Sequence, residues 1–217
     1  MLIAFDLEGT LLDGELFPEM GRALNIEALR EITLKGIRGE LSFEESLFKR
    51  INIIKGVPIE DVKEICRKLS LNRGVKETIK ELKDLGCIPT IITGGFDILA
   101  ERVARELDIG IVYSNRFLLT NGRITSVKKP IVTPEMKAKY LIYLSKKFGF
   151  GLDRCIAVGD GANDIPMMKI AGLSIAFHAK DCVKAKAKIV VNDDLNGIIP
   201  HVKQFIERAT QVNPLFR

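Results

Sequence analysis

The sequence has few of the residues on which nucleic-acid-binding surfaces depend. Tryptophan is absent, aromatic residues make up 6% of the 217 positions, and the positive charges are scattered although the formal net charge is +5. Nucleic-acid binding relies on stacking aromatic residues or on a continuous basic stripe. The densest basic stretch, residues 180–188 (KDCVKAKAK), is typical of a solvated helix face. We therefore expect no nucleic-acid partner.

Cysteine and long apolar runs are also scarce. The four cysteines lie far apart without a Cys-x-x-Cys pair, which argues against a zinc knuckle and against a secreted disulfide framework. No apolar run approaches the roughly 20 residues of a membrane span. The opening MLIAFDLEG has no basic flank and no cleavage site, so it does not resemble a signal peptide. These absences predict a cytoplasmic protein without membrane contact.

Acidic residues, in contrast, are crowded near the start of the chain. The stretch FDLEGTLLDGE contains Asp6, Glu8, Asp13 and Glu15, and it directly follows an apolar strand. Like charges at such spacing repel one another unless a cation lies among them. The crowding therefore predicts that a positive group lies close to these carboxylates.

A helical insertion is predicted after this acidic stretch, over residues 14–73. Within it, Ser42 and Glu45 have the spacing of a capping box, which marks the start of a helix. Pro58 follows Gly56 and is predicted to begin another helix.

From residue 74 onward, strand and helix patterns alternate. Such alternation favours a mostly parallel sheet with helices on both faces. The stretch LLTNGRIT adds the Asn-Gly signature of a two-residue hairpin turn. We therefore predict an α/β fold with a Rossmann-like core of residues 1–13 and 74–217, interrupted by the helical insertion of residues 14–73.

Three polar clusters fall at the ends of predicted strands: DLEGT, TGG and GDGANDIP. Ligands of parallel sheets bind beyond the carboxyl ends of the strands. Asp160 and Asp164 stand four residues apart across a glycine turn. Together with Asp6 and Glu8 they make an oxygen-rich cluster of the kind that suits Mg²⁺.

The TGG cluster predicts a seat for a phosphate group. Thr93 offers a hydroxyl, and Gly94 offers an exposed backbone N–H near a helix start. Lys137, on the helix that Thr133 and Pro134 begin, adds a cation, although most lysines on helices are solvated.

These motifs resemble, in their order along the chain, the four motifs of the haloacid dehalogenase-like (HAD) phosphatases. The four are DLEGT, IITGG, a lysine on a later helix, and GDGAND, and the helical insertion resembles the cap domain of that superfamily. The stretches GELSFEESLFKR, IITGGFDI and AVGDGANDIPMM resemble the phosphoserine phosphatases more closely. The likeness extends over about residues 3–199.

The resemblance implies a Mg²⁺-dependent phosphatase of serine biosynthesis that hydrolyses O-phospho-L-serine through an aspartyl-phosphate. It assigns the nucleophile to Asp6 and the general acid and base to Glu8. It implies that the metal is held by Asp6, the backbone carbonyl of Glu8 and Asp160, with Asp164 reaching it through water.

The same resemblance implies two groups of substrate-binding residues. The phosphoryl oxygens would be held by Thr93, Gly94, Lys137 and Asn163. The amino-acid end would be held by Glu15, Phe43 and Arg50. An arginine fork suits a carboxylate and a glutamate suits an ammonium group.

Glu8 is a departure from the family pattern, because an aspartate is usual at that position. A glutamate there also resembles the phosphoserine:homoserine phosphotransferases, and an acid displaced by about an ångström can change rates greatly. Another small phosphomonoester as substrate, a catalytically silent phosphate-binding relative and a signalling receiver domain are further alternatives. A homodimer is compatible with the sequence.

Overall fold

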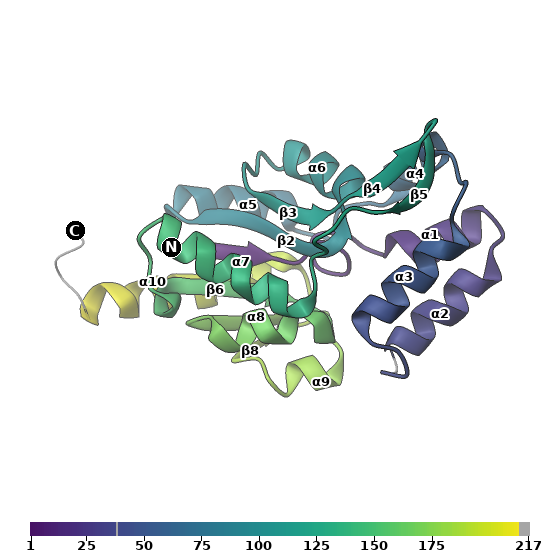
Figure 1. The fold of residues 1–217 in the computed structure, drawn as a ribbon. Helices are drawn as coiled ribbons and strands as arrows, with labels where there is room; N and C mark the ends of the chain where they lie inside the picture. Colours follow the sequence, from purple (N-terminus) through teal and green to yellow (C-terminus); the bar gives the residue numbers. More distant parts are fainter. Residues whose placement is uncertain (38, 213–217) are drawn as a thin grey trace.

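A computed structural model gives the arrangement of residues 1–37 and 39–212 (Figure 1). Residues 213–217 of the predicted core therefore lie outside the described part of the chain. No helix within the described ranges is long and apolar enough to cross a membrane.

The core is a six-stranded sheet in which every pairing is parallel. The strand order is β3-β2-β1-β6-β7-β8. The strands are β1 (Leu2–Phe5), β2 (Ile88–Phe96), β3 (Val112–Asn115), β6 (Cys155–Gly159), β7 (Leu173–Phe177) and β8 (Ile189–Val191). This is the Rossmann order, and its switch point lies beside β1, where the chain turns from one half of the sheet to the other. The predicted fold class is confirmed.

Helices cover both faces of the sheet, which explains why β1 is buried along its whole length. Ile3 and Phe5 pack into one apolar cluster, and Leu2 and Ala4 pack into another on the opposite face. The first cluster is covered by α5 (Val75–Asp84), α6 (Asp97–Glu106), η3 (Leu195–Ile198) and α10 (Ile199–Val212). The second is covered by α7 (Pro134–Lys147), η1 (Leu152–Arg154), α8 (Ile165–Ile170) and α9 (Asp181–Lys184).

In its described part, the segment predicted to be all-helical contains four helices beside the sheet (Figure 1). They are α1 (Leu16–Ala23), α2 (Glu27–Ile37), α3 (Phe43–Ile53) and α4 (Ile59–Lys68). Among its described residues the segment contains no strand, only isolated bridges at Pro58 and Leu71. The capping box of Ser42 and Glu45 is present at the start of α3. The domain limits themselves, residues 1–13 with 74–217 and residues 14–73, stay a prediction.

The predicted hairpin joins β4 (Phe117–Thr120) to β5 (Arg123–Val127). Asn121 and Gly122 form its turn with φ values of 50° and 72°, the left-handed region that an Asn-Gly pair adopts readily. The hairpin also bonds to the helical insertion: the N–H of Gly56, in the loop between α3 and α4, donates to the Ile124 carbonyl at 2.8 Å, and the N–H of Ile59, the first residue of α4, donates to the Gly122 carbonyl at 2.9 Å. The β4–β5 hairpin thus connects the core to the helical insertion by backbone hydrogen bonds.

One strand differs from the prediction. The TGG cluster was expected to follow the end of its strand, but β2 continues through Gly94 and Gly95 to Phe96. Its register against β3 shifts between Ile92 and Phe96, as in a β-bulge. Bulges re-aim backbone groups near active sites, so the strand turns its polar groups without ending.

Candidate active site

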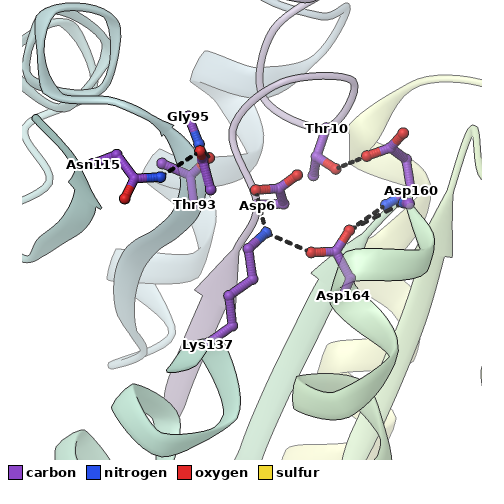
Figure 2. A network of polar contacts seen from close by, with 10 residues as sticks. Asp6, Thr10, Thr93, Gly95, Asn115, Lys137, Asp160 and Asp164 are labelled. Atoms are coloured by element: carbon purple, nitrogen blue, oxygen red, sulfur yellow. Dashed lines mark hydrogen bonds and ion pairs between the residues drawn. The ribbon is translucent and has the colours of Figure 1, made fainter. Parts of the chain in front are cut away.

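Three carboxylates meet at the carboxyl ends of two neighbouring strands (Figure 2). Asp6 follows β1 directly, Asp160 follows β6, and Asp164 ends the short helix η2 (Ala162–Asp164). Each offers an oxygen within 4.8 Å of the others. Asp6 and Asp164 are buried, and Asp160 is partly buried.

Lys137 supplies the cation that the crowded acids predicted. Its Nζ donates to Asp6 Oδ1 at 2.6 Å and to Asp164 Oδ1 at 2.7 Å (Figure 2). Burial by itself would lower the pKa of this ammonium group, but the two carboxylates outweigh burial and raise the pKa above its usual value. Lys137 is therefore charged when it joins the two strand ends.

The carboxylates still repel one another. Burial, followed by repulsion from Asp6, raises the pKa of Asp164 to about 6. Burial, followed by repulsion from Asp164 and Asp6, raises the pKa of Asp160 well above its usual range. A divalent cation would relieve this repulsion, and hard oxygen ligands at this spacing fit such an ion. The cluster is thus consistent with a divalent metal site.

Hydrogen bonds and close packing fix the loops around the carboxylate cluster. Asp164 Oδ2 accepts the backbone N–H groups of Asp160 and Gly161 at 3.1 and 3.0 Å. Gly9 has a φ of 77°, and a Cβ there would lie 2.7 Å from the Asp160 carboxylate carbon. Only glycine accepts this conformation without strain and lets the first loop approach Asp160.

Glu8 lies in the loop that follows β1, directly before Gly9. Its Oε1 accepts the N–H of Leu16, the first residue of α1, at 2.8 Å. Burial raises the pKa of Glu8 to about 7, with smaller contributions from Glu15 and Asp6, while the hydrogen bond from Leu16 opposes the rise. A carboxyl group that titrates near neutrality can give up and take back a proton.

The predicted phosphate seat lies on the bulged part of β2. Thr93 Oγ1 accepts the N–H of Gly95 at 2.9 Å. Asn115, at the end of β3, donates from Nδ2 to the Gly94 carbonyl at 2.7 Å, and its Oδ1 accepts the N–H of Val132 at 2.8 Å. Asn115 was not predicted: its polar character is visible in the sequence, but its place beside Gly94 follows only from the pairing of β3 with β2.

Above these groups is a cavity of about 320 Å³. Its walls include most of the residues predicted for the site: Asp6, Glu8, Glu15, Phe43, Arg50, Thr93, Gly94, Asp160 and Asn163. Lys137 and Asp164, which were also predicted, are buried and reach the site only through their bonds to Asp6 and to the Asp160 loop.

The helical insertion closes over this cavity. A Cβ at Gly94 would lie 2.7 Å from Cζ of Phe43, so the ring of Phe43 rests on the phosphate seat. Arg50 and Glu15 also line the cavity. The structure thus brings the expected substrate-binding residues of the insertion to the carboxylates of the core.

Several cavity residues were not predicted. Phe17 of α1 lies under the guanidinium of Arg50. Lys180 and Cys182 line the cavity although their basic stretch was predicted to be a solvated helix face, and only Asp181–Lys184 of that stretch is helical. A loop between a strand and a short helix brings Lys180 there, which residue composition alone does not indicate.

Comparison with known proteins agrees with this geometry. Residues 1–172 match the family model described as haloacid dehalogenase-like hydrolase. The chain is 38% identical over 205 residues to a phosphoserine phosphatase of Methanocaldococcus jannaschii, covering 93% of this chain and 97% of that protein.

Two solved structures are similar throughout. One is a phospho-aspartyl intermediate analogue of phosphoserine phosphatase, with a TM-score of 0.88 and 37% identity over 93% of this chain and 98% of that chain. The other is a substrate-bound phosphoserine phosphatase complex, with a TM-score of 0.88 and 37% identity over 93% and 97% of the two chains. With the carboxylate cluster on a Rossmann-ordered sheet and helices closing over it, these matches identify the chain as a member of the phosphoserine phosphatase family of the haloacid dehalogenase-like hydrolases.

Proposed function

We propose that the protein is a phosphoserine phosphatase, which hydrolyses O-phospho-L-serine to serine and phosphate through a phospho-aspartyl intermediate on Asp6. The observation that carries the proposal is one cavity with the Asp6–Lys137–Asp164 cluster beneath it and with Arg50 and Glu15 on its wall. The relatives and solved structures named phosphoserine phosphatase support it. The activity belongs to serine biosynthesis.

The two ends of phosphoserine match the two sides of the cavity. The phosphoryl oxygens would meet Thr93, the Gly94 N–H and Asn163, with Lys137 beneath them. The carboxylate would meet the guanidinium of Arg50, and the ammonium group would meet Glu15. Nε of Arg50 is occupied by the Ser46 carbonyl at 3.2 Å, but neither terminal nitrogen has a hydrogen bond or an ion pair within the described residues. That free fork suits a carboxylate.

Asp6 is arranged for attack on phosphorus. Lys137 holds Oδ1, which leaves Oδ2 as the attacking atom. As the bond from Oδ2 to phosphorus forms, the bond from phosphorus to the serine oxygen breaks, and Glu8 in its protonated form gives its proton to that oxygen. The pKa of about 7 keeps a large share of Glu8 protonated at neutral pH.

Glu8 then acts in the opposite direction. In its ionised form it takes a proton from a water molecule that attacks the phosphoryl group, and the bond from phosphorus to Asp6 breaks to release phosphate. The Leu16 N–H holds Oε1, so the carboxyl group stays in one place for both steps.

We propose Mg²⁺ as the ion of the carboxylate cluster. Asp6, the backbone carbonyl of Glu8 and Asp160 would hold it, with Asp164 reaching it through water. When bound, the ion neutralises the charge of the phosphoryl group as it is transferred. The donor set supports a divalent ion, and Mg²⁺ is favoured because it retains waters and needs few carboxylates.

Asp6→Asn tests the nucleophile. The amide keeps the shape of the side chain but cannot form the acyl phosphate, so phosphate release from phosphoserine should fall by on the order of 10³-fold or more. The matched control is Asp13→Asn, an exposed residue of the same acidic stretch, which should retain activity. Turnover by a folded Asp6→Asn protein at more than a few per cent would refute the covalent mechanism.

Removing the metal should lower the Tm of the protein as well as its activity. Because the pKa values of Asp164 and Asp160 are raised in the folded protein, ionisation of these groups costs the metal-free fold stability as the pH rises through about 6. Mg²⁺ should therefore raise Tm more at about pH 7.5 than at about pH 5, and should restore activity after chelation. An equal rise in Tm at both pH values would contradict binding at these carboxylates.

Glu8→Gln should lower turnover of phosphoserine by about 10²- to 10⁴-fold, the usual contribution of a positioned acid or base. p-Nitrophenyl phosphate separates the two roles, because p-nitrophenolate leaves without a proton. On this substrate the mutant should give a burst of p-nitrophenol equal to the enzyme concentration and then stall as phospho-Asp6. Steady release without a burst would mean that Glu8 is not the base of the second step.

Arg50→Ala should lower kcat/KM for phosphoserine by about 10- to 100-fold, because a charge-assisted bond to the carboxylate is lost. Phosphoethanolamine lacks only the carboxylate, so the decrease in kcat/KM for this substrate should be much smaller. The control is Lys49→Ala, at the exposed neighbouring position of α3, which should leave kcat/KM unchanged for both substrates. Equal losses on both substrates would show that Arg50 does not read the carboxylate.

A further inference from the structure

The guanidinium of Arg50 rests on an aromatic ring that has no part in the proposed reaction. Its central carbon lies 4.4 Å from the ring centroid of Phe17, a residue of α1 that is only 5% exposed. Nε of the same group is held by the Ser46 carbonyl. One face and one edge of the guanidinium are therefore fixed by the protein, while both terminal nitrogens stay available within the described ranges.

The ring of Phe17 is itself held in place. It packs edge-to-face against Phe96 at 5.8 Å and 81°, and Phe96 stacks on Phe117 at 3.7 Å and 4°. We call Phe17, Phe96 and Phe117 the aromatic column. Phe96 ends β2 just after the phosphate seat, and Phe117 begins β4 of the hairpin. The column therefore connects the core strand that carries Thr93 and Gly94 to the arginine of the helical insertion.

An aromatic support differs from an acidic one at this position. Glu8 and Glu15 lie near enough to influence the charge of Arg50, and a direct ion pair with either would occupy the fork. The face of an aromatic ring attracts a guanidinium through its quadrupole without accepting its N–H groups. Phe17 can thus stabilise the partly buried charge of Arg50 and leave the N–H donors of its guanidinium free for a ligand.

We propose that Phe17 is a positioning residue for substrate specificity: through its contact with Arg50, it orients the guanidinium for the substrate carboxylate before the substrate binds. The inference rests on the proposed function of Arg50. A long arginine side chain loses rotamer freedom when a ligand immobilises it, and a preformed orientation removes part of that cost. The benefit is binding energy shared by the bound substrate and the transition state, so it appears mainly in KM.

Phe17→Leu keeps an apolar side chain but removes the ring face. KM for phosphoserine should rise by about 3- to 30-fold, the range that a cation–π contact supports, and kcat should change little. KM for phosphoethanolamine should change by less than about 2-fold. Phe17→Tyr keeps the ring and should retain most of the wild-type KM. The matched control is Phe48→Leu, also within the helical insertion, where the ring lies under Lys129 at 5.5 Å and does not line the cavity.

Fluorinated phenylalanines at position 17 provide a second measurement that depends little on folding. Each added fluorine weakens the electrostatic attraction of the ring face while changing its shape only slightly. KM for phosphoserine should rise stepwise with fluorine content, and KM for phosphoethanolamine should stay level. A flat series on phosphoserine would overturn the proposal, because Phe17 would then act by packing alone.

The double variant Phe17→Leu/Arg50→Ala separates this inference from the function on which it rests. If Phe17 acts through Arg50, the double variant should match Arg50→Ala on phosphoserine. Suppose that Arg50→Ala lowers kcat/KM for phosphoserine selectively, but Phe17→Leu has no effect or an effect that simply adds to that of Arg50→Ala. The positioning role is then refuted, and the proposed function still stands. An Arg50→Ala loss that is equal on both substrates refutes the carboxylate assignment and the role of Phe17 with it.

Discussion

The buried ammonium group of Lys137, between Asp6 and Asp164, is the contact on which the rest of the site depends. Its three members come from α7, the end of β1 and the short helix after β6, and their side chains are at most 6% exposed. Loss of one partner of such a buried pair leaves an uncompensated charge, which costs about 3–5 kcal/mol. The three elements must therefore come together with little freedom, and the two strand ends gain the spacing that a divalent cation needs.

Chemistry and recognition are divided between the two parts of the chain. The groups proposed to transfer the phosphoryl group stand at strand ends of the core, where buried strands on both sides hold them. The groups proposed to recognise serine lie at the start of α1 and along α3. The hairpin and the aromatic column connect the two parts, so the insertion is held to the core both between α3 and α4 and at α1.

Much of the fold and of the site could be predicted because the signals are local. The capping box of Ser42, the Asn-Gly turn and the alternation of strands and helices each arise within a few residues. Asn115 and Phe17 could not be predicted in the same way. Asn115 is recognisable only once β3 is known to lie beside β2, and Phe17 has the pattern of any apolar residue in a helix until Arg50 is placed above it.

The amino-acid sequence by itself determined the order of the elements, the helical insertion and the polar residues that follow β1 and β6, since backbone propensity and hydrophobic period act over short distances. Only the tertiary structure decided what those residues do to one another. The pKa of about 7 at Glu8 arises mainly from desolvation in the folded chain, and the charge of Lys137 is maintained by acids 131 and 27 residues away along the chain. Desolvation and Coulomb energy depend on distance in space and on exclusion of water, and neither quantity exists until the chain has folded.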